Sequence, residues 1–290
     1  MNERPASLSS KVAWLRHLRR RRGQKIVVQA LRMYRFHRTP FERIIDNILE
    51  VIQKQGASFT FPTVASVGLQ KPELLRRIVQ SGSEIASHGY VHLKYPLISA
   101  KDQEADVVRA LSTFQRMGIQ IRGFRAPYNA YDKNTPRIID RLGLLWDGGI
   151  GHSEENRTKM DLFRVKIEGR DSSFVCVPLN EWSDDSMIDE RNYSNEQILE
   201  VLKHAVDRAR QNKGLVMFDL HPIRMGQKDH IAVLDELVSY GKNVGGWFPT
   251  VSEAVDHRLR HGDWAGQEFC CLLTGDIDNF YFRDYLRRLF

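Results

Sequence analysis

Short apolar runs alternate with amphipathic segments along most of the chain, and this alternation limits the available folds more than any other feature. The apolar runs are typical of buried strands, and the segments between them repeat apolar residues at the spacing of a helix. Strands separated by helices indicate parallel β/α units. No linker rich in Pro, Gly or Ser divides residues 24–262, so we expect one α/β domain there, an irregular (β/α) barrel of about seven parallel strands.

Helix caps and turn residues place the expected elements. The helix over residues 39–56 stops at Gly56, and the helix over residues 194–212 starts with a capping box of Ser194 and Gln197. The expected strands are residues 25–33, 57–67, 83–87, 119–125, 144–149 and 213–222, with a hairpin of residues 161–169 and 172–179 in between. In parallel barrels the chemistry lies at the carboxyl ends of the strands.

Polar stretches follow several of these strands: residues 36–38, His88, residues 125–128 and His221. His88 and His92 stand four residues apart in "SHGYVH", a spacing at which two imidazoles can hold one metal ion on one side of a turn. A hydrolytic metal site uses three protein ligands and leaves one position open for water. The pair therefore needs a third ligand elsewhere in the chain.

The order of these motifs resembles the polysaccharide deacetylase family, the NodB-homology carbohydrate esterases, over roughly residues 25–260. "SHGYVH" is similar to the family's H-x-x-x-H motif, "RAPY" to its R-x-P-Y motif and "MFDLHP" to its late L-x-H motif. The resemblance implies that His88 and His92 bind a divalent metal, with zinc the expected ion. It also implies that His221 protonates the leaving amine and that Arg125 holds the carboxylate of the catalytic base.

The resemblance further implies a hydrolase of carbohydrate metabolism. Members of the family remove acetyl groups from N-acetylated, and sometimes O-acetylated, sugars, so we expect a deacetylase acting on non-peptide carbon–nitrogen bonds. Pro127, Tyr128 and Trp146 are the expected substrate-binding residues. Trp146 and Trp182 are alternative matches to a family tryptophan, and Asp147 resembles a family aspartate.

The first motif of the family, a pair of aspartates at the end of the first strand, has no counterpart where it is expected. No Asp or Glu lies between residues 23 and 42, where the chain reads "YRFHR". In one register His37 replaces the base and Arg38 a ligand, and the arginine would disfavour a metal. In the other, Arg35 replaces the base and His37 becomes the third ligand. We favour the second register, because three histidines make a sound catalytic metal site.

The missing aspartates leave two hypotheses open. Asp219, which we favour, or Asp147 or Asp132 replaces the base, and the protein is a metal-dependent deacetylase. Alternatively, the site is degenerate, and the protein binds a glycan or a protein partner without turnover.

The first 23 residues form a basic arm. The stretch from Lys11 to Arg22 carries six Lys or Arg and no acid, within a net charge of +7. It is expected to be either a solvated arm or a site for an anionic membrane surface or another polyanion. No nucleic-acid-binding motif accompanies it, so we expect no specific nucleic-acid binding.

Residues 263–290 are expected to be an amphipathic tail that packs on the barrel or on a second subunit. Its "DID" (Asp276 and Asp278) could attract a cation, but the chain lacks the full pattern of a calcium loop. Three cysteines without a paired framework and no apolar run of membrane-spanning length predict a cytoplasmic location, with a peripheral position at the membrane as the alternative.

Overall fold

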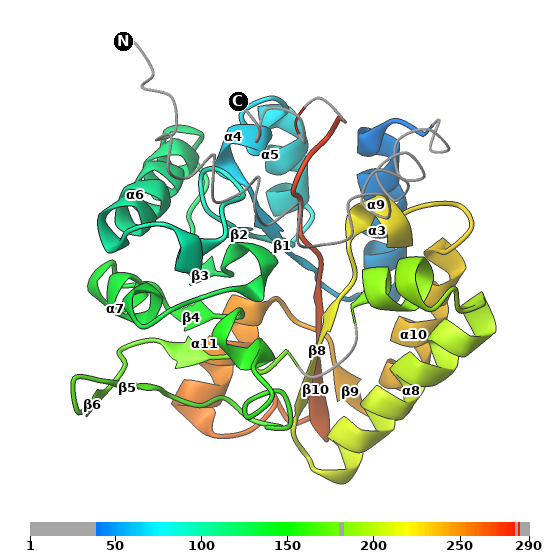
Figure 1. Cartoon of the computed structure of the whole chain (residues 1–290). Helices are drawn as coiled ribbons and strands as arrows, with labels where there is room; N and C mark the ends of the chain where they lie inside the picture. Colours follow the sequence, from blue (N-terminus) through cyan, green and yellow to red (C-terminus); the bar gives the residue numbers. More distant parts are fainter. Residues whose placement is uncertain (1–38, 180–182, 282–283, 285–290) are drawn as a thin grey trace.

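The computed structural model of the chain describes residues 39–179, 183–281 and 284, and a parallel sheet of eight strands lies at its centre. Seven strands follow one another in the order β7-β4-β3-β2-β1-β10-β8, and β9 pairs with the first residues of β10. The strands are β1 (Thr60–Thr63), β2 (Glu84–Ser87), β3 (Gly123–Phe124), β4 (Trp146–Asp147), β7 (Val175–Cys176), β8 (Leu215–Asp219), β9 (Gly246–Trp247) and β10 (Phe269–Thr274). The sheet curls into a half-barrel (Figure 1), which confirms the predicted fold class.

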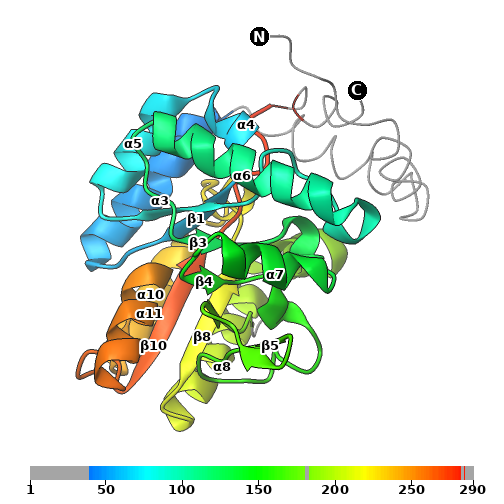
Figure 2. The same cartoon turned by 90° about the vertical axis from the view of Figure 1, so that its left-hand side faces the viewer.

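Helices surround the curled sheet on its outer side (Figures 1 and 2). They are α3 (Phe41–Gln55), α5 (Pro72–Gln80), α6 (Ala100–Arg116), α7 (Asn134–Arg141), α8 (Asn195–Gln211), α10 (Ile231–Asn243) and α11 (Val251–His261), with the short α4 (Ala65–Gly68) and α9 (Pro222–Met225). α3 buries one apolar face against the sheet and ends at Gly56, whose φ of 58° gives the left-handed cap that glycine adopts without strain. The predicted capping box of Ser194 and Gln197 opens α8. These helices confirm the periodicity read from the sequence.

Strand β10 corrects the expected boundary at residue 262. Residues 269–274 do not form a tail that packs on the barrel or on a partner but a strand of the sheet itself, which is buried along its whole length between β1 and β8. It pairs with β8 from Cys270 opposite Leu215 to Thr274 opposite Asp219, and the two strands run side by side in both views (Figures 1 and 2). The physical reason is the apolar run "FCCLLT", which is typical of a parallel strand covered on both faces.

The region of the predicted hairpin also differs from the expectation. β5 (Lys166–Ile167) and β6 (Arg170–Asp171) form a small antiparallel pair, whereas β7 leaves the hairpin and joins the main sheet parallel to β4. A single antiparallel bridge between Phe163 and Cys176 is what remains of the predicted pairing. Cys176, which lies in the apolar run "SFVCVP", is buried.

Several predictions fall outside the described residues: the strand over 25–33, the basic arm, His37 and Trp182. They stay predictions, as do the oligomeric state and the location in the cell. None of the helices in the described ranges has the length and hydrophobicity needed to cross a lipid bilayer.

The first and last described parts of the chain meet in space. The ring of Phe41, at the start of α3, lies 4.9 Å from the ring of Phe280, centroid to centroid, in an edge-on contact. Because the main sheet is parallel throughout, the carboxyl ends of β1, β2, β3, β8 and β10 gather at one edge of it. The candidate residues follow these ends.

Candidate active site

Two histidines and one aspartate converge on a single point at this edge. His88 follows β2, His92 lies in the loop after it, and Asp278 follows β10. Oδ1 of Asp278 lies 3.4 Å from Nε2 of His88 and 3.3 Å from Nε2 of His92. A tetrahedral zinc ion with bonds of about 2.0–2.1 Å separates its ligands by about 3.3–3.4 Å. The two distances from Asp278 therefore match the spacing of ligands around one such ion, and the ligand atoms of all three residues lie within 4.8 Å of one another.

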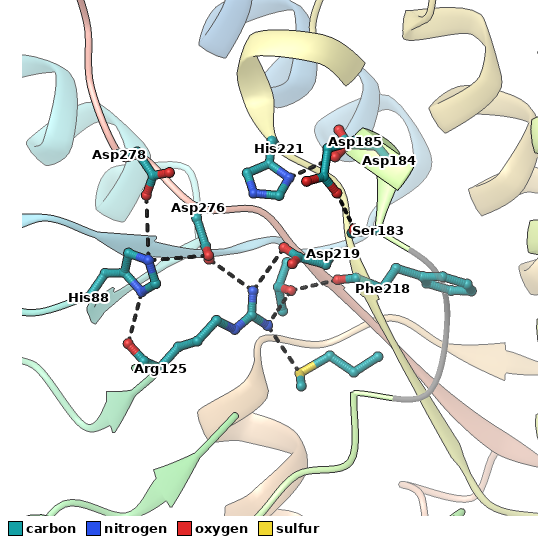
Figure 3. Close-up of polar contacts among 12 residues, drawn as sticks. His88, Arg125, Ser183, Asp184, Asp185, Phe218, Asp219, His221, Asp276 and Asp278 are labelled. Carbon is teal, nitrogen blue, oxygen red and sulfur yellow. Dashed lines mark hydrogen bonds and ion pairs between the residues drawn. The ribbon is translucent and has the colours of Figure 1, made fainter. Parts of the chain in front are cut away.

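The tautomer of His88 also fits a role as a metal ligand. Its Nδ1 lies 2.8 Å from the carbonyl oxygen of Arg125, an acceptor, so Nδ1 carries the proton and Nε2 presents its lone pair to the site (Figure 3). The side chain is 1% exposed, and Nε2 has no hydrogen-bond partner among the described residues. A buried nitrogen held in this way is suited to a metal ion, which supplies the missing partner.

A second aspartate, Asp276, lies between this point and a buried arginine. Arg125 follows β3 and is completely buried, and its Nη1 donates to Oδ1 of Asp276 at 2.9 Å and to Oδ1 of Asp219 at 3.0 Å. The other oxygen of Asp276, Oδ2, lies 3.4 Å from Nε2 of His88 (Figure 3). Burial raises the pKa of the Asp276 carboxyl, with His88 and Arg125 acting in the opposite direction.

The fourth group is a histidine paired with a buried carboxylate. His221 follows β8, and its Nδ1 lies 2.7 Å from Oδ1 of Asp184 (Figure 3). Burial lowers the pKa of His221, but the carboxylates of Asp219 and Asp184 outweigh it and hold that pKa well above its usual value. The raised pKa favours the protonated imidazole, which suits a proton donor.

The other predicted residues are placed as follows. The ring of Tyr128 lies 4.3 Å from the ring of His92, centroid to centroid, so Tyr128 is at the site, and Pro127 beside it is buried. Trp146 is completely buried, and its indole Nε1 donates to Ser252 at 3.0 Å. A tryptophan packed in this way belongs to the core, which corrects its expected place among the substrate-binding residues.

The three aspartates named as substitute bases make structural contacts instead. Asp219 binds Arg125, Asp132 accepts the backbone N–H groups of Asn134 and Thr135 at the start of α7, and Asp147 holds a turn. Burial raises the pKa of Asp147 to about 7, although its carboxylate accepts the N–H groups of residues 149 and 150.

Two carboxylates reach this site from the other end of the chain, those of Asp276 and Asp278. An acidic pair was expected between residues 23 and 42, whereas Asp276 and Asp278 were expected in a tail, where they could attract a cation. The signal was present: "TGDID" has the D-x-D spacing directly after an apolar run. Asp184 was also missed, and the sequence around it gives no motif that would have identified it.

Comparisons with known proteins agree with the fold and with the family resemblance. The sequence model of a family described as polysaccharide deacetylase matches residues 33–145. The chain is 32% identical over 82 residues to the peptidoglycan deacetylase-like protein FGM2 of Gibberella zeae, which is 28% of this chain and 24% of that protein. It is 21% identical over 224 residues to the peptidoglycan-N-acetylglucosamine deacetylase PgdA of Listeria monocytogenes, which is 77% of this chain and 38% of that protein. The chain thus spans less than two thirds of either relative.

A solved structure shares the architecture. The probable polysaccharide deacetylase from Pseudomonas aeruginosa PAO1 superimposes with a TM-score of 0.66 and 19% sequence identity, over 75% of this chain and 73% of that one. At this identity the likeness shows a common fold.

Proposed function

Because the chain belongs to the polysaccharide deacetylase family, we propose that it is a metal-dependent deacetylase that hydrolyses the acetyl group of an N-acetylated or O-acetylated sugar or glycan. The observation that carries this proposal is the convergence of His88, His92 and Asp278 on one point, with the buried Asp276 beside it. Two relatives are named for action on peptidoglycan, so polymers and oligomers of N-acetylglucosamine are the first substrates to assay.

Each residue around the point where His88, His92 and Asp278 converge has one task in this proposal. His88, His92 and Asp278 would hold the ion, which when bound polarises the acetyl carbonyl and lowers the pKa of a water molecule. Asp276 accepts the proton of that water at Oδ2, the oxygen that lies 3.4 Å from Nε2 of His88. Arg125 donates to Oδ1 of the same carboxylate and so keeps Oδ2 turned toward the site.

The leaving amine receives its proton from His221. Asp184 holds Nδ1 of His221, so Nε2 is the nitrogen that donates to the departing amine. A ring nitrogen of His221 and a carboxylate oxygen of Asp276 lie within 4.8 Å of one another. The proton acceptor and the proton donor can therefore act on one bound acetamide.

The non-catalytic alternative loses its main support. It depended on the absence of carboxylates between residues 23 and 42, and Asp276 and Asp278 supply two carboxylates from another strand. No contact of the described residues favours a purely binding role, so we keep the enzyme as the proposed function.

The purified protein is expected to hold about one zinc ion per chain and to release acetate from N-acetylglucosamine oligomers. His88→Ala and Asp278→Ala are each expected to lose the metal and the activity, because each removes one of three ligands. Zinc is measured by mass spectrometry after dialysis, and acetate by a coupled assay on the same samples.

His37→Ala separates this ligand set from the three-histidine alternative. We expect it to keep its zinc. If His37→Ala loses the metal and Asp278→Ala keeps it, the third ligand is His37 and the assignment of Asp278 is wrong. A wild-type protein that is free of metal after zinc loading, and that releases no acetate, would contradict the proposed function itself.

Asp184→Asn is expected to move the alkaline limb of the kcat/KM profile to lower pH, by roughly one pH unit. The sign follows from the charge: the Asp184 carboxylate helps to raise the pKa of His221, so removing it lets that pKa fall and the acid form is lost earlier as pH rises. Profiles of kcat/KM against pH for both proteins measure the shift.

Asp185→Asn is the matched control for this shift. Asp185 is the next residue along the chain, but its Oδ1 accepts from Ser183 and from the N–H of Ser186 instead of from His221. We expect a smaller displacement of the alkaline limb. Equal displacements in both variants would mean that net charge near His221, and not the contact with Asp184, sets the pKa of His221.

A further inference from the structure

We propose that Asp106, on α6, is a positioning residue that fixes the loop between His88 and His92 and so sets the geometry of the metal ligands. The inference rests on the proposed function in treating these two histidines as ligands. Asp106 itself touches neither of them. It acts through the backbone of the residues between them.

Asp106 accepts two consecutive N–H groups of this loop. Its Oδ2 accepts from the N–H of Tyr90 at 2.9 Å, and its Oδ1 accepts from the N–H of Val91 at 3.0 Å. The hydroxyl of Tyr95 donates to Oδ2 at 3.0 Å, and the Asp106 side chain is buried. Both oxygens of one carboxylate are therefore engaged by the loop and by the residue that follows it.

The carbonyl side of the same loop is held by a second element. The N–H groups of Ala65 and Ser66, in α4, donate to the carbonyl oxygens of Gly89 and Tyr90 at 3.0 and 3.1 Å. The loop is thus fixed along both edges of its backbone, although it forms no helix or strand of its own. The N–H of Gly89 donates to Oγ of Ser87 at 3.4 Å, whereas the N–H groups of Tyr90 and Val91 both depend on one side chain, that of Asp106.

Gly89 shows how closely the carboxylate approaches. Its φ is +77°, and a Cβ at this position would lie 2.6 Å from Oδ2 of Asp106 and 3.2 Å from the hydroxyl oxygen of Tyr95. Only glycine allows both this backbone conformation and this contact. The absence of a side chain directly after His88 therefore permits the anchoring of the loop by Asp106.

A second residue of α6 holds the side chain at the centre of the loop. The guanidinium of Arg109, three residues after Asp106, lies 3.8 Å from the centroid of the Tyr90 ring. One face of α6 thus fixes both the backbone and the ring of Tyr90. Because outer groups that orient metal ligands change metal affinity by about 10–100-fold, the loss of this anchor is expected to be visible in binding.

The chain offers a matched control at the other end of β2. Glu84, the first residue of that strand, also accepts a backbone N–H, from Ser252 at 3.0 Å, and a hydroxyl, from Thr60 at 3.0 Å. His88 follows the last residue of the same strand. Glu84→Gln and Asp106→Asn therefore make the same chemical change on opposite sides of one strand, and only the second affects the loop.

The test compares zinc affinity in the full chain, measured by competition with a chelator. We expect Asp106→Asn to weaken zinc binding about 10–100-fold and Glu84→Gln to change it less than about threefold. The visible spectrum of the cobalt-loaded protein should change in Asp106→Asn alone, since it reports the geometry of the ligands. Unchanged affinity and an unchanged spectrum in Asp106→Asn would overturn the proposal.

Amide exchange of Tyr90 and Val91 gives a readout that needs no metal. Both amides should exchange faster in Asp106→Asn than in the wild type and in Glu84→Gln, and wild-type exchange rates would overturn the proposal. If the wild type binds no zinc, the proposed function fails while this readout still decides the inference. If Asp106→Asn does not fold, Tyr95→Phe is the second variant, because it removes one donor to the same carboxylate. It should speed the amide exchange of Tyr90 to a smaller extent. An unchanged exchange rate at Tyr90 in Tyr95→Phe would count against the proposal.

Discussion

Asp276→Asn is expected to lower kcat by about 10²–10⁴-fold while zinc binding stays at the wild-type level. The amide keeps the size of the side chain and can still accept from Arg125, whose Nη1 lies 2.9 Å from Oδ1. It cannot take a proton from water, so the step assigned to Oδ2 loses its base. Acetate release at saturating substrate and zinc content are measured on the same preparation, at a pH where His221 is protonated.

Asp219→Asn is the control for this experiment. Asp219 is also buried and also accepts from Nη1 of Arg125, at 3.0 Å, so both variants remove one negative charge from the same guanidinium. Asp219 was the substitute base favoured from the sequence, and the assignment of Asp276 requires its own variant to be much the slower. If Asp219→Asn is the slower enzyme, or if the two lose activity equally, Asp276 is not the base.

The site residues that could be predicted from the sequence are those that belong to short motifs. His88 and His92 lie close together after β2, Arg125 directly follows β3, and His221 comes two residues after β8, so local patterns were sufficient to select them. Asp276 and Asp278 were missed because their contact with these residues joins opposite ends of the chain. Asp184 reaches His221 across a separation of 37 residues, and no local pattern encodes that contact.

For the fold, too, local features could be predicted from the sequence and long-range pairing could not. Apolar periodicity and helix caps predicted the helices and most strands, because these signals depend on residues a few positions apart. The place of β10 between β1 and β8 depends on pairing between distant segments, and the sequence of β10 alone does not specify its neighbours. In the family resemblance the aspartate pair comes first, whereas the pair that we propose, Asp276 and Asp278, comes last. The contact of Phe41 with Phe280 shows that the two ends of the described chain nevertheless meet.

A chain that ends at Gly262, the boundary expected from the sequence, should fail to fold cooperatively. It lacks β10, whose side chains Phe269, Leu272 and Leu273 are at most 1% exposed. Burial of each such side chain contributes roughly 1.5–3 kcal/mol, so these three alone contribute about 5–9 kcal/mol. The whole free energy of unfolding of a domain is only about 5–15 kcal/mol. The deletion also leaves β1 and β8 without the strand that joins them.

Denaturant unfolding followed by circular dichroism tests this expectation. The full chain should unfold in one cooperative transition, and the shortened chain should show none. Adding a peptide of residues 263–290 should restore the transition, because the strand pairs through its backbone and needs no covalent link to find its place. It should also restore zinc binding, since the peptide carries Asp278. If the shortened chain unfolds cooperatively at the wild-type midpoint, β10 is not part of the stable sheet, and Asp276 and Asp278 must be removed from the active site.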